Sequence, residues 1–245
     1  MNLIKEIIAF FSFFARSVFI PWRLGKTLGR IVRQIYILGF SSIPLIVVIS
    51  VFVGMVSAVQ TWYQMTRVMP KFLLGTTVAR IIMIELGPVL TALMVTGRIS
   101  SSMAAELGTM KVTDQIDALK AMAIDPYRFL VLPRIIATFI SLPILTIFAE
   151  LVSILSAAFI AHNFINVNVR TFIYGITNYF YTRDFFGGVT KSLAFSLAIS
   201  TSGCYFGFRV TGGAKEVGRA STLAVVTASI LILLFDFIVA LIFFS

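Results

Sequence analysis

Five charged residues fall inside long apolar stretches of this sequence, where a charge needs a polar partner or a cavity. A charged side chain within a membrane is costly and usually faces the protein interior, water or another charge. Acids in such places can relay protons or pair with a base on a neighbouring helix. The first candidates for a functional site are therefore Arg80, Glu85, Glu150, Lys191 and Asp236.

Glu85 and Lys191 have opposite charges, and we expect them at similar depths in the outer half of the membrane. This pattern favours a pairing of the two residues, or a shared polar cavity in the outer half of the membrane; the alternative is a purely structural ion pair that holds two helices together. Glu150 and Asp236 are single acids in apolar runs. For each of them an interhelical hydrogen bond is favoured over a proton-relay role.

The composition places these residues in a membrane protein. Of the 245 residues, 59% are apolar and only 12% are charged, whereas soluble domains carry about a quarter charged residues. A membrane helix needs roughly 20 apolar residues, and this chain has several blocks of that length. Because the apolar residues come in blocks rather than alternating with polar ones, the fold class is an all-α, polytopic membrane protein.

The order of apolar and polar blocks predicts one domain, 1–245, with three kinds of segment. Residues 1–40 read as an amphipathic interfacial segment, for which a short extra span is the alternative. A polar surface helix is expected at 109–125, with Thr109 as N-cap and its end before Pro126. The predicted transmembrane helices are 43–63, 76–99, 133–164, 185–208 and 222–244.

The distribution of Lys and Arg predicts the orientation. With five spans, 14 of the 20 basic residues fall on the side of the N-terminus and the polar helix. Basic residues collect on the cytoplasmic side. We therefore expect a cytoplasmic N-terminus and a C-terminus on the opposite, periplasmic side. The net charge of +10 fits basic residues beside anionic lipid headgroups better than nucleic-acid binding.

The sequence offers no catalytic or metal-binding residues that we could identify. Cys204 and His162 are the only residues of their types. The single cysteine excludes an internal disulfide and a multi-cysteine metal site, and the single histidine argues against a His-based metal cluster and a Ser-His-Asp triad. The glycine-rich stretch 212–218 lacks the order of a phosphate-binding loop. If ATP drives this protein, another chain must hydrolyse it, and no cofactor is expected here.

Three further residues have structural interpretations. Arg98 lies at the end of a predicted helix, where a cation favours the helix dipole and its side chain can reach the headgroups. Gly203 and Gly207 have the spacing that lets two membrane helices approach closely.

Ordered motifs across the chain resemble those of the MlaE/YrbE-type permeases, from about residue 32 to the C-terminus. They are ELGPVL at 85–90, GR at 97–98, AAELGTMKVTDQIDAL at 104–119, AIDPYR at 123–128, PR at 133–134, SLP at 141–143, GAKEVGRA at 213–220, AVV at 224–226 and DF at 236–237.

The resemblance implies the permease subunit of an ABC transporter, a homodimer in a bacterial inner membrane or in the inner envelope of plastids. A separate ABC ATPase would carry ATP and Mg²⁺, and an MCE-domain protein would bind the substrate. Some systems add a STAS-domain subunit. The implied cargo is phospholipid, moved between inner and outer membranes.

The resemblance also implies residue roles. Glu85 matches an acidic pocket position and Lys191 a basic position facing the same cavity. The family often has Arg directly before that acid, where this chain has Ile84, and Arg80 is the candidate to replace it. The segment 109–125 would be the coupling helix that docks on the ATPase. The expected coupling residues are Glu106, Lys111, Asp114, Gln115 and Asp117.

Three rival functions remain open from the residues alone. An ion-coupled secondary transporter would use the intramembrane acids and would need no ATPase. An intramembrane lipid-modifying enzyme would need a nucleophile and a base, for which the sequence shows no convincing pair. A structural scaffold without cargo is the third.

Overall fold

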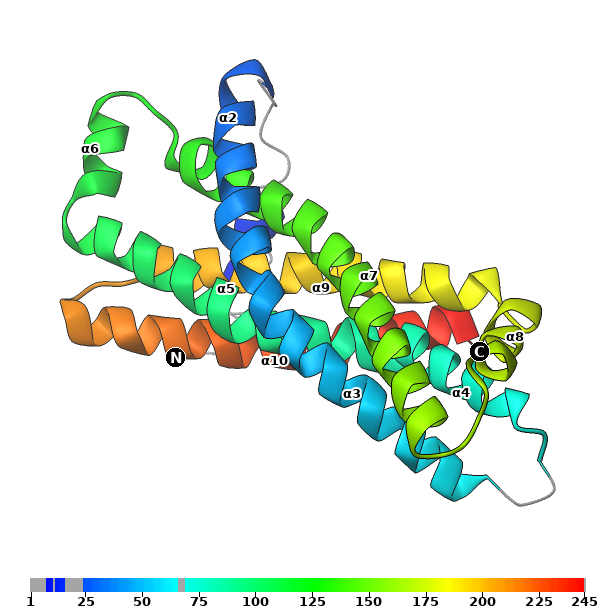
Figure 1. The fold of residues 1–245 in the computed structure, drawn as a ribbon. Helices are drawn as coiled ribbons and strands as arrows, with labels where there is room; N and C mark the ends of the chain where they lie inside the picture. Colours follow the sequence, from blue (N-terminus) through cyan, green and yellow to red (C-terminus); the bar gives the residue numbers. More distant parts are fainter. Residues whose placement is uncertain (1–7, 11, 16–23, 66–68, 245) are drawn as a thin grey trace. The chain divides into compact units, whose positions relative to one another are not determined.

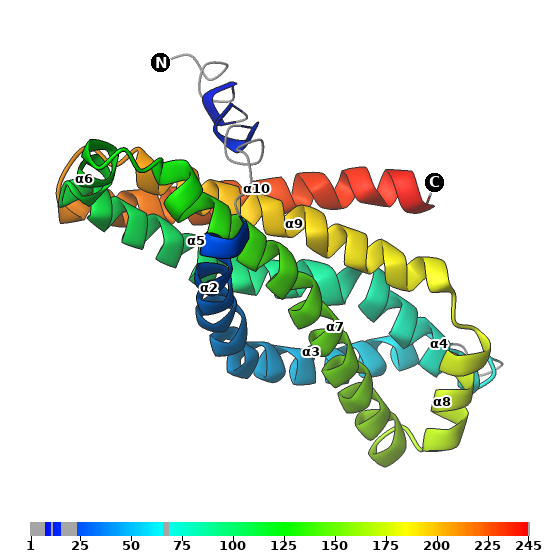
Figure 2. The same ribbon diagram turned by 90° about the horizontal axis from the view of Figure 1, so that it is seen from above.

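The computed structural model describes residues 8–10, 12–15, 24–65 and 69–244, with the side chains of 24–27 and 244 left undescribed. The predicted interfacial segment 1–40 therefore lies partly outside the described residues. Every regular element in the described part is a helix (Figures 1 and 2), as the sequence predicts. The α-helices are α2 (Leu24–Gln34), α3 (Ile43–Gln64), α4 (Phe72–Ile81), α5 (Gly87–Val112), α6 (Gln115–Ala121), α7 (Leu132–Asn163), α8 (Val169–Asn178), α9 (Thr182–Phe208) and α10 (Ala214–Phe244).

Four helical stretches of the described chain are long and apolar enough to cross a membrane: Leu28–Gln64, Phe72–Val112, Tyr127–Asn163 and Ala214–Phe243. Each overlaps one of the predicted spans, with 133–164 and 222–244 extending one residue beyond the corresponding stretch. The fifth predicted span, 185–208, lies within α9, a helix of 27 residues. It does not join this set because Lys191 and many serine, threonine and glycine residues reduce its hydropathy.

The exposed faces of the long helices are apolar, which is the reverse of a soluble protein. Large apolar side chains point outward along α3, α7 and α10, where lipid or another apolar surface must cover them. They include Val48, Phe52, Val56 and Val59 of α3, Ile144, Leu151, Leu155 and Phe159 of α7, and Val226, Ile230, Leu233 and Phe237 of α10.

Two short π-helices come directly before α-helices that carry a proline near their start: Ile82–Leu86 joins α4 to α5, and Tyr127–Val131 leads into α7. Each ends two residues before a proline, Pro88 or Pro133. A proline ring clashes with the carbonyl four residues earlier in an α-helix. The wider π turn relieves this clash, since Gly87 N–H donates to Ile82 O, five residues back.

The surface helix is shorter than predicted. The helix expected at 109–125 is α6, Gln115–Ala121, because α5 continues through Val112 and Thr109 lies inside it rather than at an N-cap. Asp114 begins α6 in the left-handed region, at φ 56°. Ala123, at φ 57°, ends it with the Ala123 N–H bonded to Lys120 O and Ile124 N–H to Leu119 O. This is a Schellman motif.

The described chain forms two compact units. Unit 1 comprises residues 1–41, 93–141 and 194–234, and unit 2 comprises 42–92, 142–193 and 235–245. Because the boundaries fall inside helices, α5, α7, α9 and α10 contribute residues to both.

In unit 2, α4 and α8 lie side by side (Figures 1 and 2). A Cβ on Gly75 would lie 2.1 Å from Phe172 O, and one on Gly175 would lie 2.0 Å from Phe72 O. The backbones therefore touch, and Thr76 Oγ1 donates to Gly175 O at 2.7 Å. The core around this contact contains Ala58, Leu74, Val78, Ile82, Ala157, Ala161, Val167 and Phe172.

In unit 1, α9 packs against α5 through small residues. A Cβ on Gly203 would lie 2.9 Å from Ser100 O, and one on Gly207 would lie 3.0 Å from Ala104 O. This is the close approach expected from the spacing of the two glycines. Residues 8–10 and 12–15 are also helical, and Phe13 is buried among the rings of Tyr127, Tyr205 and Phe208.

Candidate functional site

The candidate site of unit 2 is a cluster of three charges from three elements. Glu85 lies in the π-helix Ile82–Leu86, Lys191 in α9 and Asp236 in α10. A π turn inserts an extra residue and re-aims the side chains it carries, which is why such turns recur at functional sites. Glu85 is thus carried by a π turn that ends two residues before Pro88.

Lys191 is the centre of this cluster. Its Nζ lies 2.5 Å from Glu85 Oε2 and 2.7 Å from Asp236 Oδ1. The predicted pairing of Glu85 with Lys191 is therefore present. Asp236 Oδ1 lies within ion-pair distance of Lys191 without hydrogen-bond alignment. The interhelical partner expected for Asp236 is thus Lys191 itself.

The three side chains differ in exposure, and this difference defines what the cluster can do. The Lys191 side chain is fully buried, that of Asp236 is 16% exposed and that of Glu85 is 49% exposed. A buried ammonium needs a negative partner, and it has two. With both acids ionised the cluster carries one excess negative charge, and Glu85 is its most exposed member.

Glu150 lies near this cluster in unit 2 but is not part of it. Its carboxyl is buried, and its side chain lies against Gly87 and Gly188, where added Cβ atoms would come within 2.6 Å of its Cγ and 3.5 Å of its Oε1 respectively. The interhelical hydrogen bond expected for Glu150 is absent from the described part of the chain.

Arg80 does not join the Glu85 cluster. Its Nε donates to Asp184 Oδ2 at 2.7 Å, and its guanidinium lies 4.8 Å from the centre of the Tyr181 ring. Asp184 is almost completely buried. The headgroup role assigned to Arg80 remains a prediction, while its observed carboxylate partner is Asp184, a residue that the sequence placed in a loop and did not mark as functional.

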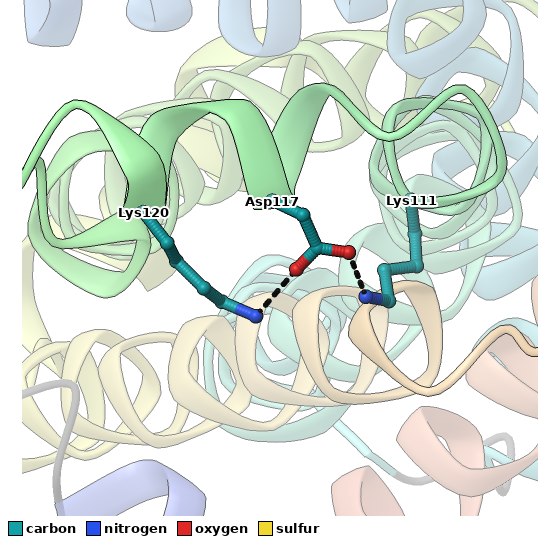
Figure 3. A network of polar contacts seen from close by, with 3 residues as sticks. All are labelled: Lys111, Asp117 and Lys120. Atoms are coloured by element: carbon teal, nitrogen blue, oxygen red, sulfur yellow. Dashed lines mark hydrogen bonds and ion pairs between the residues drawn. The ribbon is translucent and has the colours of Figure 1, made fainter.

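Of the predicted coupling residues in unit 1, Lys111, Asp117 and Glu106 form ion pairs, whereas Asp114 and Gln115 are exposed. Asp117 accepts from Lys111 Nζ at 2.8 Å and from Lys120 Nζ at 2.7 Å (Figure 3). Glu106 Oε1 lies 2.8 Å from Arg134 Nη2, and the buried Arg134 also donates to Leu130 O. Asp114 and Gln115 are exposed at the start of α6. Docking by these residues remains a prediction.

The two lysines hold the pKa of Asp117 well below its ordinary value of 3.8, at about 2, the Lys111 hydrogen bond contributing most and that of Lys120 next. A carboxyl with a lowered folded-state pKa stabilises the fold above its unfolded pKa. This contribution is lost as the pH falls from about 4 through about 2. The Asp117 carboxylate is therefore ionised at neutral pH and can form its ion pairs with Lys111 and Lys120.

We expect the Asp117 carboxyl to titrate near pH 2, as followed by its side-chain ¹³C chemical shift in labelled protein. In a Lys111→Gln/Lys120→Gln variant its pKa should return towards the ordinary range, because both donors are gone. An ordinary pKa in the unchanged protein would show that the ion pairs of Figure 3 do not persist in solution.

The remaining singled-out residues have structural surroundings. Arg98 Nη2 contacts Ile37 O at 3.5 Å within unit 1. His162 is exposed near the end of α7, and Cys204 is buried in α9. Within the described ranges no group of three or more metal-ligating side chains comes together.

Two important partners escaped the sequence reasoning. Arg134 was noted only as part of a motif, yet it is a buried cation in an apolar helix and so carried the same signal as Lys191. Asp184 stood at the end of a predicted loop, and its pairing with Arg80 depends on tertiary placement. Spacing along the chain does not show that Arg134 pairs with Glu106 or that Asp184 pairs with Arg80.

Comparison with known proteins now connects this architecture to a family. Residues 31–242 match the family described as Permease MlaE. A probable ABC transporter permease protein of Rickettsia typhi is 37% identical over 98% of this chain and 92% of its own length.

Two further relatives carry more specific names. The intermembrane phospholipid transport system permease protein MlaE of Haemophilus influenzae is 31% identical over 98% of this chain and 95% of its own. The protein trigalactosyldiacylglycerol 1, chloroplastic, of Arabidopsis thaliana is 34% identical over 92% of this chain and 63% of its own. A match over nearly the full length of a multi-pass helical chain leaves one conclusion: this protein belongs to the MlaE permease family.

Proposed function

We propose that this chain is the membrane-spanning subunit of an ATP-driven transporter that moves phospholipid between an inner and an outer membrane. The proposal is supported by the relative of Haemophilus influenzae, which is named as the permease of an intermembrane phospholipid transport system and is similar over nearly the full length of both chains. The single structural observation that carries it is the Lys191 cluster. It presents one accessible carboxylate beside a fully buried cation within apolar helices.

The chemistry of the cluster suits a lipid with a polar head. Apolar helix surfaces accommodate acyl chains, while Glu85 can contact a cationic or hydroxyl-bearing part of a headgroup. Because Lys191 is fully buried and Asp236 is mostly buried, Lys191 holds Glu85 in place and Asp236 holds Lys191, while neither is presented to the cargo as Glu85 is. In this proposal Glu85 touches the lipid, and the other two residues position it.

Energy for transport comes from partner chains in this proposal. A separate ABC ATPase binds ATP and Mg²⁺ and docks on the segment around α6, so that this chain is not itself an enzyme. An MCE-domain protein hands over or receives the lipid, and some systems add a STAS-domain subunit. Two copies of this chain form the permease, in a bacterial inner membrane or a plastid inner envelope, with the N-terminus in the cytoplasm and the C-terminus on the other side.

We expect the detergent-solubilised protein to co-purify from its native membrane with an ABC ATPase, an MCE-domain protein and phospholipid, as identified by mass spectrometry. An Asp114→Lys/Asp117→Lys variant should lose the ATPase, because α6 would then present added positive charge where acids are needed. A Glu216→Lys variant makes the same kind of change outside the coupling segment and should keep the ATPase.

Recovery of the unchanged protein alone, stable and free of lipid, would contradict the proposed function. Loss of the ATPase from the Glu216 variant as well would show that charge reversal acts non-specifically and would remove the assignment of α6 as the docking helix.

A further inference from the structure

Unit 1 contains a cavity of about 430 Å³ that the proposed transport cycle does not use. Ligand pockets typically measure about 300–1,000 Å³. We call it the basic–aromatic pocket. Its walls come from the helical residues near the N-terminus, the end of α5, α6, the π-helix Tyr127–Val131 and the end of α9. The lining residues are Ala9, Ser12, Phe13, Lys111, Ile116, Lys120, Pro126, Tyr127, Tyr205, Phe208 and Arg209.

Three cations line this pocket and one carboxylate adjoins it. Lys111 and Lys120 each use one contact on Asp117, through different carboxylate oxygens (Figure 3). An ammonium group has three donors, so each lysine keeps donors for a ligand. Arg209 donates to the Tyr205 hydroxyl, and its guanidinium lies 5.1 Å from the centre of that ring. The surplus of two positive charges favours an anion.

The pocket lining is also rich in aromatic residues. Tyr127 and Phe208 stack with centroids 5.4 Å apart, and Phe13 lies 5.3 Å from Tyr127 and 5.7 Å from Tyr205. Such rings offer an apolar surface, and the tyrosines add a polar tip at its edge. A ligand that fits both kinds of lining has an anionic head next to an apolar body.

The pocket lies where membrane helices end. Lys111 is the last residue but one of α5, Phe208 is the last of α9, and Tyr127 begins the stretch that continues into α7. Tyrosine and basic residues at helix ends belong to the headgroup region of a membrane. Basic pockets between membrane helices at this depth bind anionic headgroups.

We propose that the basic–aromatic pocket binds the phosphate of an anionic phospholipid, with Lys111, Lys120 and Arg209 around the phosphate and the aromatic residues against the glycerol and the first methylenes. The lipid is a fixed ligand, separate from the cargo at the Glu85 cluster. With the orientation given under the proposed function, the pocket lies on the cytoplasmic side, and only this choice of leaflet rests on the proposed function.

Such a lipid would tie several elements together. Lys120 belongs to α6, Lys111 to α5 and Arg209 follows α9, while Phe13 brings the N-terminal residues against the same cavity. A bound headgroup would therefore hold α6 against its neighbours. The position of the predicted coupling helix would then depend on the anionic lipid content of the membrane.

The test uses the purified permease without any ATPase, in nanodiscs of phosphatidylcholine and phosphatidylglycerol, followed by mild delipidation and native mass spectrometry. We expect the unchanged protein to retain phosphatidylglycerol over phosphatidylcholine. A Lys120→Gln/Arg209→Gln variant should lose about tenfold of this preference, since each cation near the surface contributes to anionic lipid binding. A Lys215→Gln/Arg219→Gln variant removes the same charge from exposed positions of α10 and should keep it.

A Lys120→Arg/Arg209→Lys variant keeps the charge and should retain the lipid, which guards against misfolding as the cause of any loss. Equal loss in the pocket and control variants would overturn the proposal in favour of a general surface effect. Displacement of the lipid by millimolar inorganic phosphate would assign the pocket to a free anion. Unchanged preference for phosphatidylglycerol in the Lys120→Gln/Arg209→Gln variant would overturn the proposal, because the pocket cations would then not hold the lipid. None of these outcomes bears on lipid transport itself.

Discussion

Replacing Lys191 by methionine should abolish lipid transfer and destabilise the protein by about 3–5 kcal/mol, the cost of removing one partner from a buried ion pair. Lys191 is fully buried between Glu85 and Asp236. Its loss leaves two carboxylates close together with no cation. Thermal unfolding in detergent and ATP-dependent transfer of a fluorescent phospholipid would measure the two effects.

A Glu85→Gln/Lys191→Met/Asp236→Asn variant separates stability from function. It removes all three charges, so the fold should recover most of the lost stability. Transfer should stay low, because the accessible carboxylate of Glu85 is gone. If the Lys191 variant alone were as stable and active as the unchanged protein, the three charges would not form the cluster described here.

Replacing Gly54 by alanine should destabilise unit 2, although alanine favours a helix over glycine by about 1 kcal/mol. An added Cβ would lie 1.9 Å from Ser153 O and 2.2 Å from Ser156 Oγ. The first of these atoms is backbone, so α3 and α7 must separate, and the Ser153 Oγ hydrogen bond to Ser50 O at 3.0 Å would be strained. Overpacking of this kind typically costs 1–3 kcal/mol.

The matched control is Gly218→Ala in α10. No atom lies within 4 Å of its added Cβ, so only the helix preference remains and the melting temperature should rise or stay unchanged. The prediction is a difference in sign between the two substitutions in thermal unfolding. A Gly54 variant that is as stable as the Gly218 variant would show that α3 and α7 are not in backbone contact.

The sequence was sufficient for features that depend on local pattern. Apolar blocks predicted the helices, and opposite charges at similar depths predicted the contact between Glu85 and Lys191. The spacing of Gly203 and Gly207 predicted a close approach of α9 to another helix, although not that this helix is α5. Each of these depends on residue type and periodicity within one or two helices.

Other features depend on tertiary placement and were not predictable. Nothing along the chain shows that Asp236 of α10 reaches Lys191 of α9, or that Arg80 pairs with Asp184 instead of approaching Glu85. The surface helix was overestimated because its left-handed ends, at Asp114 and Ala123, occur without glycine. The π turn that carries Glu85 ends two residues before Pro88. A search for apolar residues at 3.6 residues per turn does not reveal such a turn.

The most direct test of the account is ATP-dependent lipid transfer by the permease reconstituted in liposomes with its ATPase and MCE-domain partner, measured with and without an ionophore that collapses ion gradients. The account predicts transfer of phospholipid that requires ATP hydrolysis, persists with the ionophore and is lost in the Lys191→Met variant. Transfer that needs no ATPase and stops with the ionophore would contradict it and would identify an ion-coupled carrier.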